Sequence, residues 1–244
     1  MSFSERERIL AKISHGKKGS KCAKENIKHD FFPNTTRQQE HISENSVYGN
    51  ETLISQFEES CNQLPVKVFR VESVEQVHQR LSSILRDKGI MKAVLWDSGL
   101  ILSMEIEALL KKLGVRNVWK SEKGPSRPEQ MKEYSKKMGQ AEVGITGADY
   151  ALADTGTLVL RSVSGQDRGS SLLPPLHITL LESSRILPGS DELLSIIAED
   201  TKHEGFMKSC ITLITGPSKT ADIELTLVRG VHGPGELFVI LLDF

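Results

Sequence analysis

The chain is built around the stretch AEVGITGADYALADTGTLVL, from Ala141 to Leu160. It begins with the apolar run Val143–Ile145, which is short enough for a buried strand, and it ends with Thr157–Leu160, whose β-branched residues predict a second strand. Between them, Ala148–Asp154 has the length of about two helical turns, with glycines on either side as breaks. We therefore expect a strand, a short helix and another strand in close succession.

Polar side chains are concentrated in the turns of this stretch, where scaffolds usually display functional groups. Gly147 permits a positive φ or a close approach, and the amides that follow it could point at an anion from a helix start. Asp149, in the first turn of that helix, could act as a carboxylate base or cap the helix, and its spacing leaves both roles open. The predicted ligand-binding residues here are Thr146, Gly147, Ala148, Asp154, Thr155, Gly156 and Thr157.

Strands alternate with helices along most of the chain, which predicts an α/β fold with a mostly parallel sheet and flanking helices. Ser73 is expected to cap the helix that follows it, and Gly89 to end that helix. Further strands are predicted at Val66–Val71, Ala93–Trp96, Val115–Trp119, Leu176–Leu181, Ile211–Ile214 and Leu237–Leu242. Further helices are predicted at Thr52–Leu64, Ser103–Leu113, Glu129–Met138, Glu192–Ala198 and Thr220–Val228.

The first 50 residues differ in character from the rest. Glu5–Ile13 could form a short amphipathic helix, but residues 15–50 are polar and lack an apolar period. Such a composition buries too little surface to offset its chain entropy, so a mobile arm or long loop is expected, with a binding segment as the alternative. The predicted organisation is this N-terminal helix and arm, residues 1–50, followed by one domain, residues 51–244.

Composition excludes several classes of function. The formal net charge of −1 gives no electrostatic reason to expect nucleic-acid binding. No apolar run approaches the roughly 20 residues that a membrane span needs, and the charged N-terminus does not suit a signal peptide. A cytoplasmic protein is expected. Cys22, Cys61 and Cys210 are isolated, so we expect three free thiols and neither a zinc site nor an iron–sulfur cluster.

The second candidate segment runs from Gly216 to Glu224, where a strand end is expected to lead through a turn into a helix. It lacks the Gly-Lys pair and the leading glycine of a phosphate loop, which rejects that motif. Ser218 or Thr220 would cap the helix, with Asp222 near its positive end. The candidates here are Gly216, Pro217, Ser218, Thr220 and Glu224 as ligand-binding residues and Asp222 as a catalytic residue.

Two histidines complete the candidate site. His232, between glycines, could act as an acid, a base or a hydrogen-bond donor, and a loop histidine without a chemical role is the alternative. Gly233 is added as a ligand-binding residue, and His177 is either a ligand-binding or a strand-edge residue. Because Asp149 and His232 follow the ends of different elements, we expect them to share a crevice at the carboxyl ends of the strands, both as catalytic residues.

With these residues in view, the chain resembles the lactate-utilisation protein C family (LutC, also YkgG), whose module is the LUD domain. The segments that carry the resemblance are GITGADYALADTGTLVL at 144–160, SLLPPLHITLLE at 171–182 and TGPSKTADIELTLVRGVHGPGELFVILLD at 215–243. The last is the most specific, because it combines SKTADIE with GVHGP at a fixed spacing. The resemblance covers roughly residues 50–244, and the helix at Glu5–Ile13 also fits it.

The resemblance implies a role in oxidising L-lactate to pyruvate together with iron–sulfur partners, the lactate-utilisation proteins A and B. This chain would be the subunit without iron–sulfur clusters, with no cofactor of its own and with a small anionic ligand and a homo-oligomeric state left open. The implied fold is similar to that of the sugar-phosphate isomerases and CoA transferases (NagB/RpiA-like).

Within that fold group, GADYALADTGTLVLRS looks like the GAD…G stretch of methylthioribose-phosphate isomerases, in which the residue matching Asp149 is catalytic. This chain has Leu158–Arg161 where the isomerase pattern has a lysine, which argues against isomerase activity. Two alternatives stay open. One is a free-standing enzyme or ligand-binding protein for a phosphorylated or CoA-linked small molecule, and the other is a purely structural partner.

Overall fold

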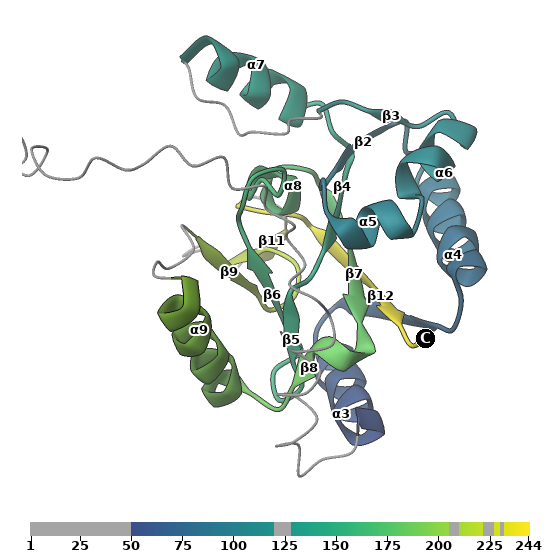
Figure 1. Cartoon of the computed structure of the whole chain (residues 1–244). Helices are drawn as coiled ribbons and strands as arrows, with labels where there is room; N and C mark the ends of the chain where they lie inside the picture. The colour runs from purple at the N-terminus through teal and green to yellow at the C-terminus, as the bar shows by residue number, and fades with distance from the viewer. Residues whose placement is uncertain (1–49, 120–127, 205–209, 222–226, 230–231) are drawn as a thin grey trace, which may run out of the picture. The chain divides into compact units, whose positions relative to one another are not determined.

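The computed structural model describes residues 50–119, 128–204, 210–221, 227–229 and 232–244 (Figure 1). The predicted helix at Glu5–Ile13 and the polar arm lie outside the described residues, apart from Asn50 at the start of the first helix described. Asp222 and Glu224 lie outside them as well. None of the helices within the described ranges is long and apolar enough to cross a membrane.

Six parallel strands form the central sheet, in the order β1-β12-β7-β4-β2-β3. The apolar runs of three inner strands, β4, β7 and β12, are buried on both faces, as is usual for parallel strands covered by other layers. The predicted mostly parallel sheet is confirmed, and the predicted strands match within two residues at most ends, β3 being shorter. The strands are β1 Val66–Val71, β2 Lys92–Leu95, β3 Arg116–Asn117, β4 Val143–Gly147, β7 Leu176–Glu182 and β12 Glu236–Leu242.

A second sheet has the order β8-β5-β6-β9. Its strands are β5 Tyr150–Leu152, β6 Thr157–Arg161, β8 Ile186–Leu187 and β9 Ile211–Ile214. The predicted helical turns at Ala148–Asp154 are therefore wrong. Tyr150 and Leu152 pack into one apolar cluster and Ala151 into another, so both faces of β5 are buried. A strand can bury side chains on both of its faces, and this tertiary packing overrides the local helix preference of the segment.

The helices are α3 Asn50–Asn62, α4 Val74–Asp87, α5 Gly99–Ser103, α6 Ile106–Lys112, α7 Pro128–Met138, α8 Gly169–Leu172 and α9 Ser190–Glu204, with a 3₁₀ turn at Ser183–Arg185. Ser73 caps α4 as predicted, because its hydroxyl accepts from the Gln76 amide at 3.3 Å. The helix predicted at Ser103–Leu113 begins later, as α6 at Ile106, and a helix that was not predicted, α5, precedes it; the two are separated where Glu105 adopts a φ of +50°. This break allows Ile101 of α5 and Ile106 of α6 both to be buried.

Residues 220–228 were predicted to be helical, and this prediction is also wrong. Lys219–Ala221 (β10) and Leu227–Arg229 (β11) pair as an antiparallel hairpin, with Lys219 opposite Arg229. The apolar residues from Ala221 to Leu227 recur at every second position, which is the period of a strand. That alternation was the signal for a hairpin in the sequence.

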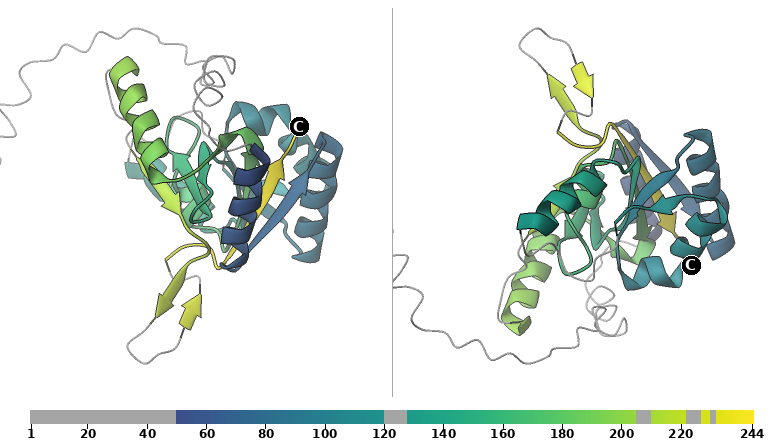
Figure 2. Two further views of the ribbon diagram at one scale, coloured as in Figure 1. Left: turned by 90° about the horizontal axis from the view of Figure 1, so that it is seen from below. Right: turned by 90° about the horizontal axis from the view of Figure 1, so that it is seen from above.

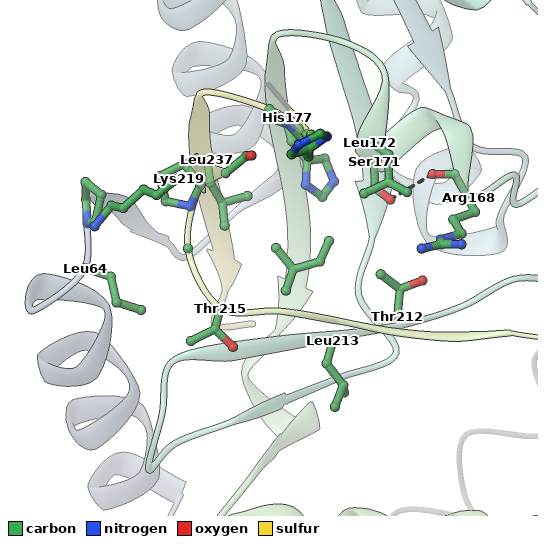
Figure 3. Close-up of a pocket in the computed structure, with 18 residues that line it drawn as sticks. Leu64, Arg168, Ser171, Leu172, His177, Thr212, Leu213, Thr215, Lys219 and Leu237 are labelled. Atoms are coloured by element: carbon green, nitrogen blue, oxygen red, sulfur yellow. Dashed lines mark hydrogen bonds between the residues drawn. The ribbon is translucent and has the colours of Figure 1, made fainter. Parts of the chain in front are cut away.

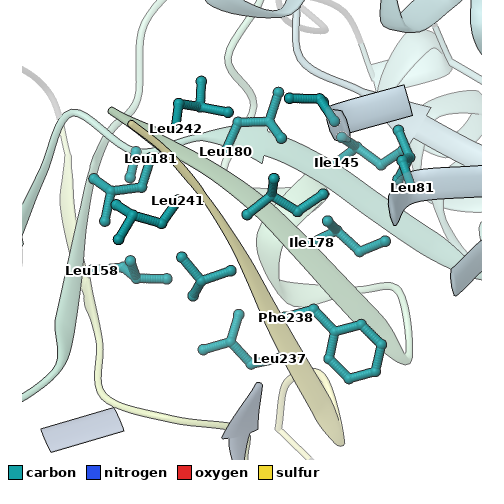
Figure 4. Close-up of a cluster of buried hydrophobic side chains, with 14 of the residues drawn as sticks. Leu81, Ile145, Leu158, Ile178, Leu180, Leu181, Leu237, Phe238, Leu241 and Leu242 are labelled. Atoms are coloured by element: carbon teal, nitrogen blue, oxygen red, sulfur yellow. The ribbon is translucent and has the colours of Figure 1, made fainter. Parts of the chain in front are cut away.

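The core lies on both faces of the central sheet. Helices α4, α5 and α6 lie on one side of it, and the second sheet with α9 lies on the other (Figures 1 and 2). Side chains alternate accordingly along β7 and β12, with Ile178 and Phe238 on one side and Leu181 and Leu241 on the other, toward Leu158 of β6 (Figure 4). The central sheet is therefore sandwiched, and a functional site must open at one end of the strands.

Candidate functional site

A cavity of about 580 Å³ opens at the amino ends of three central strands (Figure 3). Pro65 directly precedes β1, His177 is the second residue of β7, and Pro234 comes shortly before β12. The opposite wall comes from β9 and the turn that follows it, Thr215–Ser218. The predicted crevice was at the carboxyl ends, so its position is corrected. Since β9 belongs to the second sheet, the carboxyl-end rule for a single parallel sheet does not govern where the two sheets part.

The cavity unites part of the predicted site. Its predicted members come from three separate segments of the chain, and they are His177, Gly216, Pro217, Ser218, His232 and Gly233. Thr220 belongs to β10, but its side chain is outside what the structure describes. A strand, β10, begins directly after Ser218, so Ser218 is not a helix cap, and its amide donates to the Pro234 carbonyl at 2.8 Å.

His177 is a buried polar residue of the cavity wall, with 1% of its surface exposed. Its Nε2 lies 2.8 Å from the hydroxyl of Thr146 on β4 and 3.0 Å from that of Thr179, two residues along β7. The two hydroxyls are 3.2 Å apart. Burial lowers the pKa of His177 to about 3, so the ring is neutral at physiological pH. Its Nδ1 is buried and has no hydrogen-bond partner among the described residues.

Helix α8, which contributes to the cavity wall, packs directly against β4 at Gly144. Glycine has no side chain, so nothing holds the helix away from the strand there. A Cβ on Gly144 would lie 1.8 Å from the Ser170 carbonyl oxygen, so the helix backbone rests directly on the strand. Ser170 and Ser171 are buried there, and the Ser171 hydroxyl donates to the Arg168 carbonyl at 3.0 Å. This packing places Ser171 and Arg168 in the cavity wall.

The charged side chains of the wall are all basic. Arg168 and Lys219 are exposed residues of the lining, and no aspartate or glutamate is among the lining residues that the structure describes. Sequence reasoning missed Arg168, Ser171, Thr179 and Lys219 as site residues. The spacing of His177 and Thr179 could have indicated a shared face, because strand residues two apart point the same way.

Asp149 does not lie in this cavity and does not cap a helix. Its amide donates to the Val159 carbonyl at 2.9 Å, as strand pairing requires. Its carboxylate accepts from the Arg161 amide at 2.7 Å and from the Arg161 guanidinium at 3.0 Å, and the same guanidinium donates to Asp200 at 2.7 Å. The crevice that Asp149 was expected to share with His232 is therefore not formed.

The other predicted residues of the central stretch lie beside the cavity and not in its lining. Thr157 bonds Thr155 and Thr215, each at 2.8 Å between hydroxyl oxygens, and only Thr215 lines the cavity. Gly156 has a φ of +64°, and a Cβ there would lie 3.1 Å from the Cys61 amide nitrogen. Both the backbone conformation and the close packing therefore explain why a glycine is at this position. Asp154 is exposed and bonded by Thr155, and Gly147 ends β4 ahead of Ala148.

A second cavity, of about 690 Å³, lies at the carboxyl ends of β2 and β3. None of the predicted site residues lines it, and its wall carries three acidic residues, Asp97, Glu105 and Glu107, with Lys111 and Arg116. No group of three or more His, Cys, Asp or Glu residues suited to a metal occurs in the described ranges. Cys61 and Cys210 are both free.

The two-sheet α/β fold with its cavity identifies the class of domain to which the chain belongs. The LUD domain model matches residues 54–242, and the chain belongs to that family. A solved DUF162 family protein from Deinococcus radiodurans has the same fold, with a TM-score of 0.57 and 22% identity over 80% of this chain and 99% of that one.

Among curated proteins, the chain is similar to those named Lactate utilization protein C. It is 31% identical to that of Halalkalibacterium halodurans over 80% of this chain and 81% of the relative. It is 32% identical to that of a Geobacillus species over 80% of each chain. The family resemblance stated from the sequence is thereby confirmed.

Proposed function

We propose that this chain is a component of a lactate-utilisation system that oxidises L-lactate to pyruvate. The observation that carries the proposal is the similarity to proteins named Lactate utilization protein C over four-fifths of both chains. The cavity supports it, because the segments 171–182 and 215–243, which carry the sequence resemblance, supply most of the lining.

In this role the chain is the subunit without iron–sulfur clusters, and it acts with iron–sulfur partners, the lactate-utilisation proteins A and B, in the cytoplasm. Its three cysteines are far apart in the sequence, whereas such clusters use closely spaced runs. Burial raises the pKa of Cys61 to about 12, which disfavours the thiolate that metal binding requires. The partners would therefore supply the redox centres.

Genetic complementation together with co-purification tests the proposal. A bacterial strain that lacks its own protein C should recover growth on L-lactate, but show no change on glucose, when it expresses this chain. A tagged copy should co-purify with iron–sulfur proteins, while the chain purified alone should be colourless and iron-free. Failure of complementation together with failure of co-purification would contradict the proposal.

A second candidate is a free-standing enzyme or ligand-binding protein for a phosphorylated or CoA-linked small molecule. The cavity favours it, because about 580 Å³ is within the usual range of ligand pockets, about 300–1,000 Å³, and leaves room for more than a three-carbon acid. Normal growth on L-lactate in a strain lacking this chain, with a growth defect on another substrate, would support this candidate over the first.

A further inference from the structure

The cavity at the amino ends of β1, β7 and β12 has the lining of an anion site. Its two permanent charges are positive, those of Arg168 and Lys219, and no carboxylate lies among its described lining residues. Neither cation has a salt-bridge partner in the part of the chain that the structure describes, where other ion pairs do form. Glu236, beside the wall in sequence, instead pairs with Lys88 at 2.6 Å. Unpaired cations in a concave wall attract anions.

The remaining lining favours a ligand with an apolar body. Leu64, Leu172, Leu213, Ile214 and Leu237 supply aliphatic side chains to the wall. Leu213 is an exposed large hydrophobic residue, 57% accessible, on a strand whose neighbours are half-buried. An inorganic anion would leave this surface unused, whereas an organic anion would cover it.

The neutral ring of His177, in the same wall, carries one N–H group. Its Nε2 is approached by the hydroxyls of Thr146 and Thr179, and either hydroxyl can donate to it. When Nε2 accepts, the single proton of the neutral ring is on Nδ1, the atom without a partner in the described structure. A buried polar atom without a partner is rare in folded proteins, and a ligand in the adjoining cavity would provide one.

We propose that this cavity binds an organic anion, a carboxylate or phosphate group on an apolar body, through Arg168, Lys219 and the Nδ1–H of His177. Arg168 and Lys219 lie on opposite sides of the cavity (Figure 3), so the acid group pairs with one of the two cations, and a polar atom of the ligand accepts from His177. This inference rests on the cavity itself and holds whether the chain acts as a subunit or alone.

Binding of 8-anilinonaphthalene-1-sulfonate, an organic anion with an aromatic body, tests the charge requirement. Fluorescence titration of the purified full chain should give one saturable site, and Arg168→Gln/Lys219→Gln should raise its Kd at least tenfold. The matched control is Lys111→Gln/Arg116→Gln, which removes the same charge from the second cavity and should change Kd less than twofold. Equal weakening in both double variants, or no saturable site, would overturn the inference.

Competition identifies the acid group. Hexanoate and phenyl phosphate share an apolar body and differ in the acid, so preferential displacement by either one supports the inference and assigns the group. Displacement by neither would overturn it. Circular dichroism of each variant confirms that it is folded.

Nitrogen-15 NMR of the histidine rings tests the donor directly. The His177 ring, assigned by its loss in His177→Asn, should be the neutral Nδ1–H tautomer, and its Nδ1 resonance should shift when the dye or the displacing acid is added. An Nε2–H tautomer, or a resonance that does not move on saturation, would remove His177 from the site. The lactate-growth experiment is independent of these outcomes, so either proposal can fail without the other.

Discussion

Replacing Gly144 by alanine should destabilise this protein and disturb its cavity, although the substitution adds a single methyl group. The new Cβ would lie 1.8 Å from the Ser170 carbonyl oxygen, 2.9 Å from the carbon of the same carbonyl and 3.3 Å from a Pro174 side-chain carbon. The obstacle is mainly helix backbone, which no rotamer change can relieve. Helix α8 and strand β4 must therefore separate.

The expected cost follows from two opposing terms. Overpacking a core by forcing a backbone shift costs about 1–3 kcal/mol, and a clash this close belongs at the upper end. Alanine in place of glycine recovers about 0.5–1 kcal/mol of chain entropy. The net loss is about 2 kcal/mol, which lowers Tm by about 4–8 °C in a domain of this size.

Gly147 provides the matched control because it is on the same strand and is also buried. Its added Cβ would meet nothing closer than a Leu100 methyl group at 3.5 Å, an ordinary contact. Thermal and urea unfolding of the two variants should therefore separate them, with Gly147→Ala within about 1 kcal/mol of the wild type. Equal stability of the two variants would refute the argument that α8 rests on bare backbone at Gly144.

Three further predictions concern single residues. Because burial lowers the folded-state pKa of His177 to about 3, below its unfolded value of about 6.5, its contribution to stability is complete above pH 6.5 and falls by about 1.4 kcal/mol per unit as pH drops toward 3. The stability difference between wild type and His177→Gln should therefore shrink between pH 7 and pH 5 in urea unfolding, and a constant difference would contradict this assignment. Arg161→Met should cost about 2 kcal/mol in the same assay, since it leaves Asp149 and Asp200 without their shared cation in a partly exposed site, and a loss below about 0.5 kcal/mol would mean that solvent already screens the pair. Cys61→Ser should leave the amount of rapidly labelled thiol at pH 8 unchanged, because Cys61 is buried and burial raises the pKa of its thiol to about 12; a drop by one thiol per chain would show that Cys61 is reactive.

The central sheet was predictable because its strands are continuous apolar runs bounded by turn residues, and such runs form buried parallel strands with little ambiguity. Val66–Val71 of the central sheet was predicted with the bounds it has, and so was Ile211–Ile214 of the second sheet. The second sheet was harder to predict because its strands are short. Tyr150–Leu152 is a strand of only three residues. It is defined by its pairing with β6, across a turn, and with β8, which is distant in the sequence.

The candidate site was predicted in composition more than in position. His177, Ser218 and His232 were each named as candidate residues and line one cavity, although they are separated by up to 55 positions in the sequence. Asp149 was grouped with them because of its position after a strand. The sequence contains no sign that Arg161, twelve residues later, would occupy its carboxylate. Ion-pair partners are set by tertiary packing, which a local pattern does not contain.

The position of the cavity follows from the second sheet. In an open parallel sheet, the loops at the carboxyl ends are free to form a crevice. Here the chain leaves β4 at its carboxyl end and turns at once into β5 and β6, so Asp149 pairs within the second sheet. That sheet returns the chain through β9 to the amino ends, where the turn at Thr215–Ser218 faces His177 across the cavity. The polar turns that looked like one site from the sequence are thus divided between the two ends of the strands, and the cavity at the amino ends contains Arg168, Lys219 and His177, whose Nδ1 has no partner among the described residues.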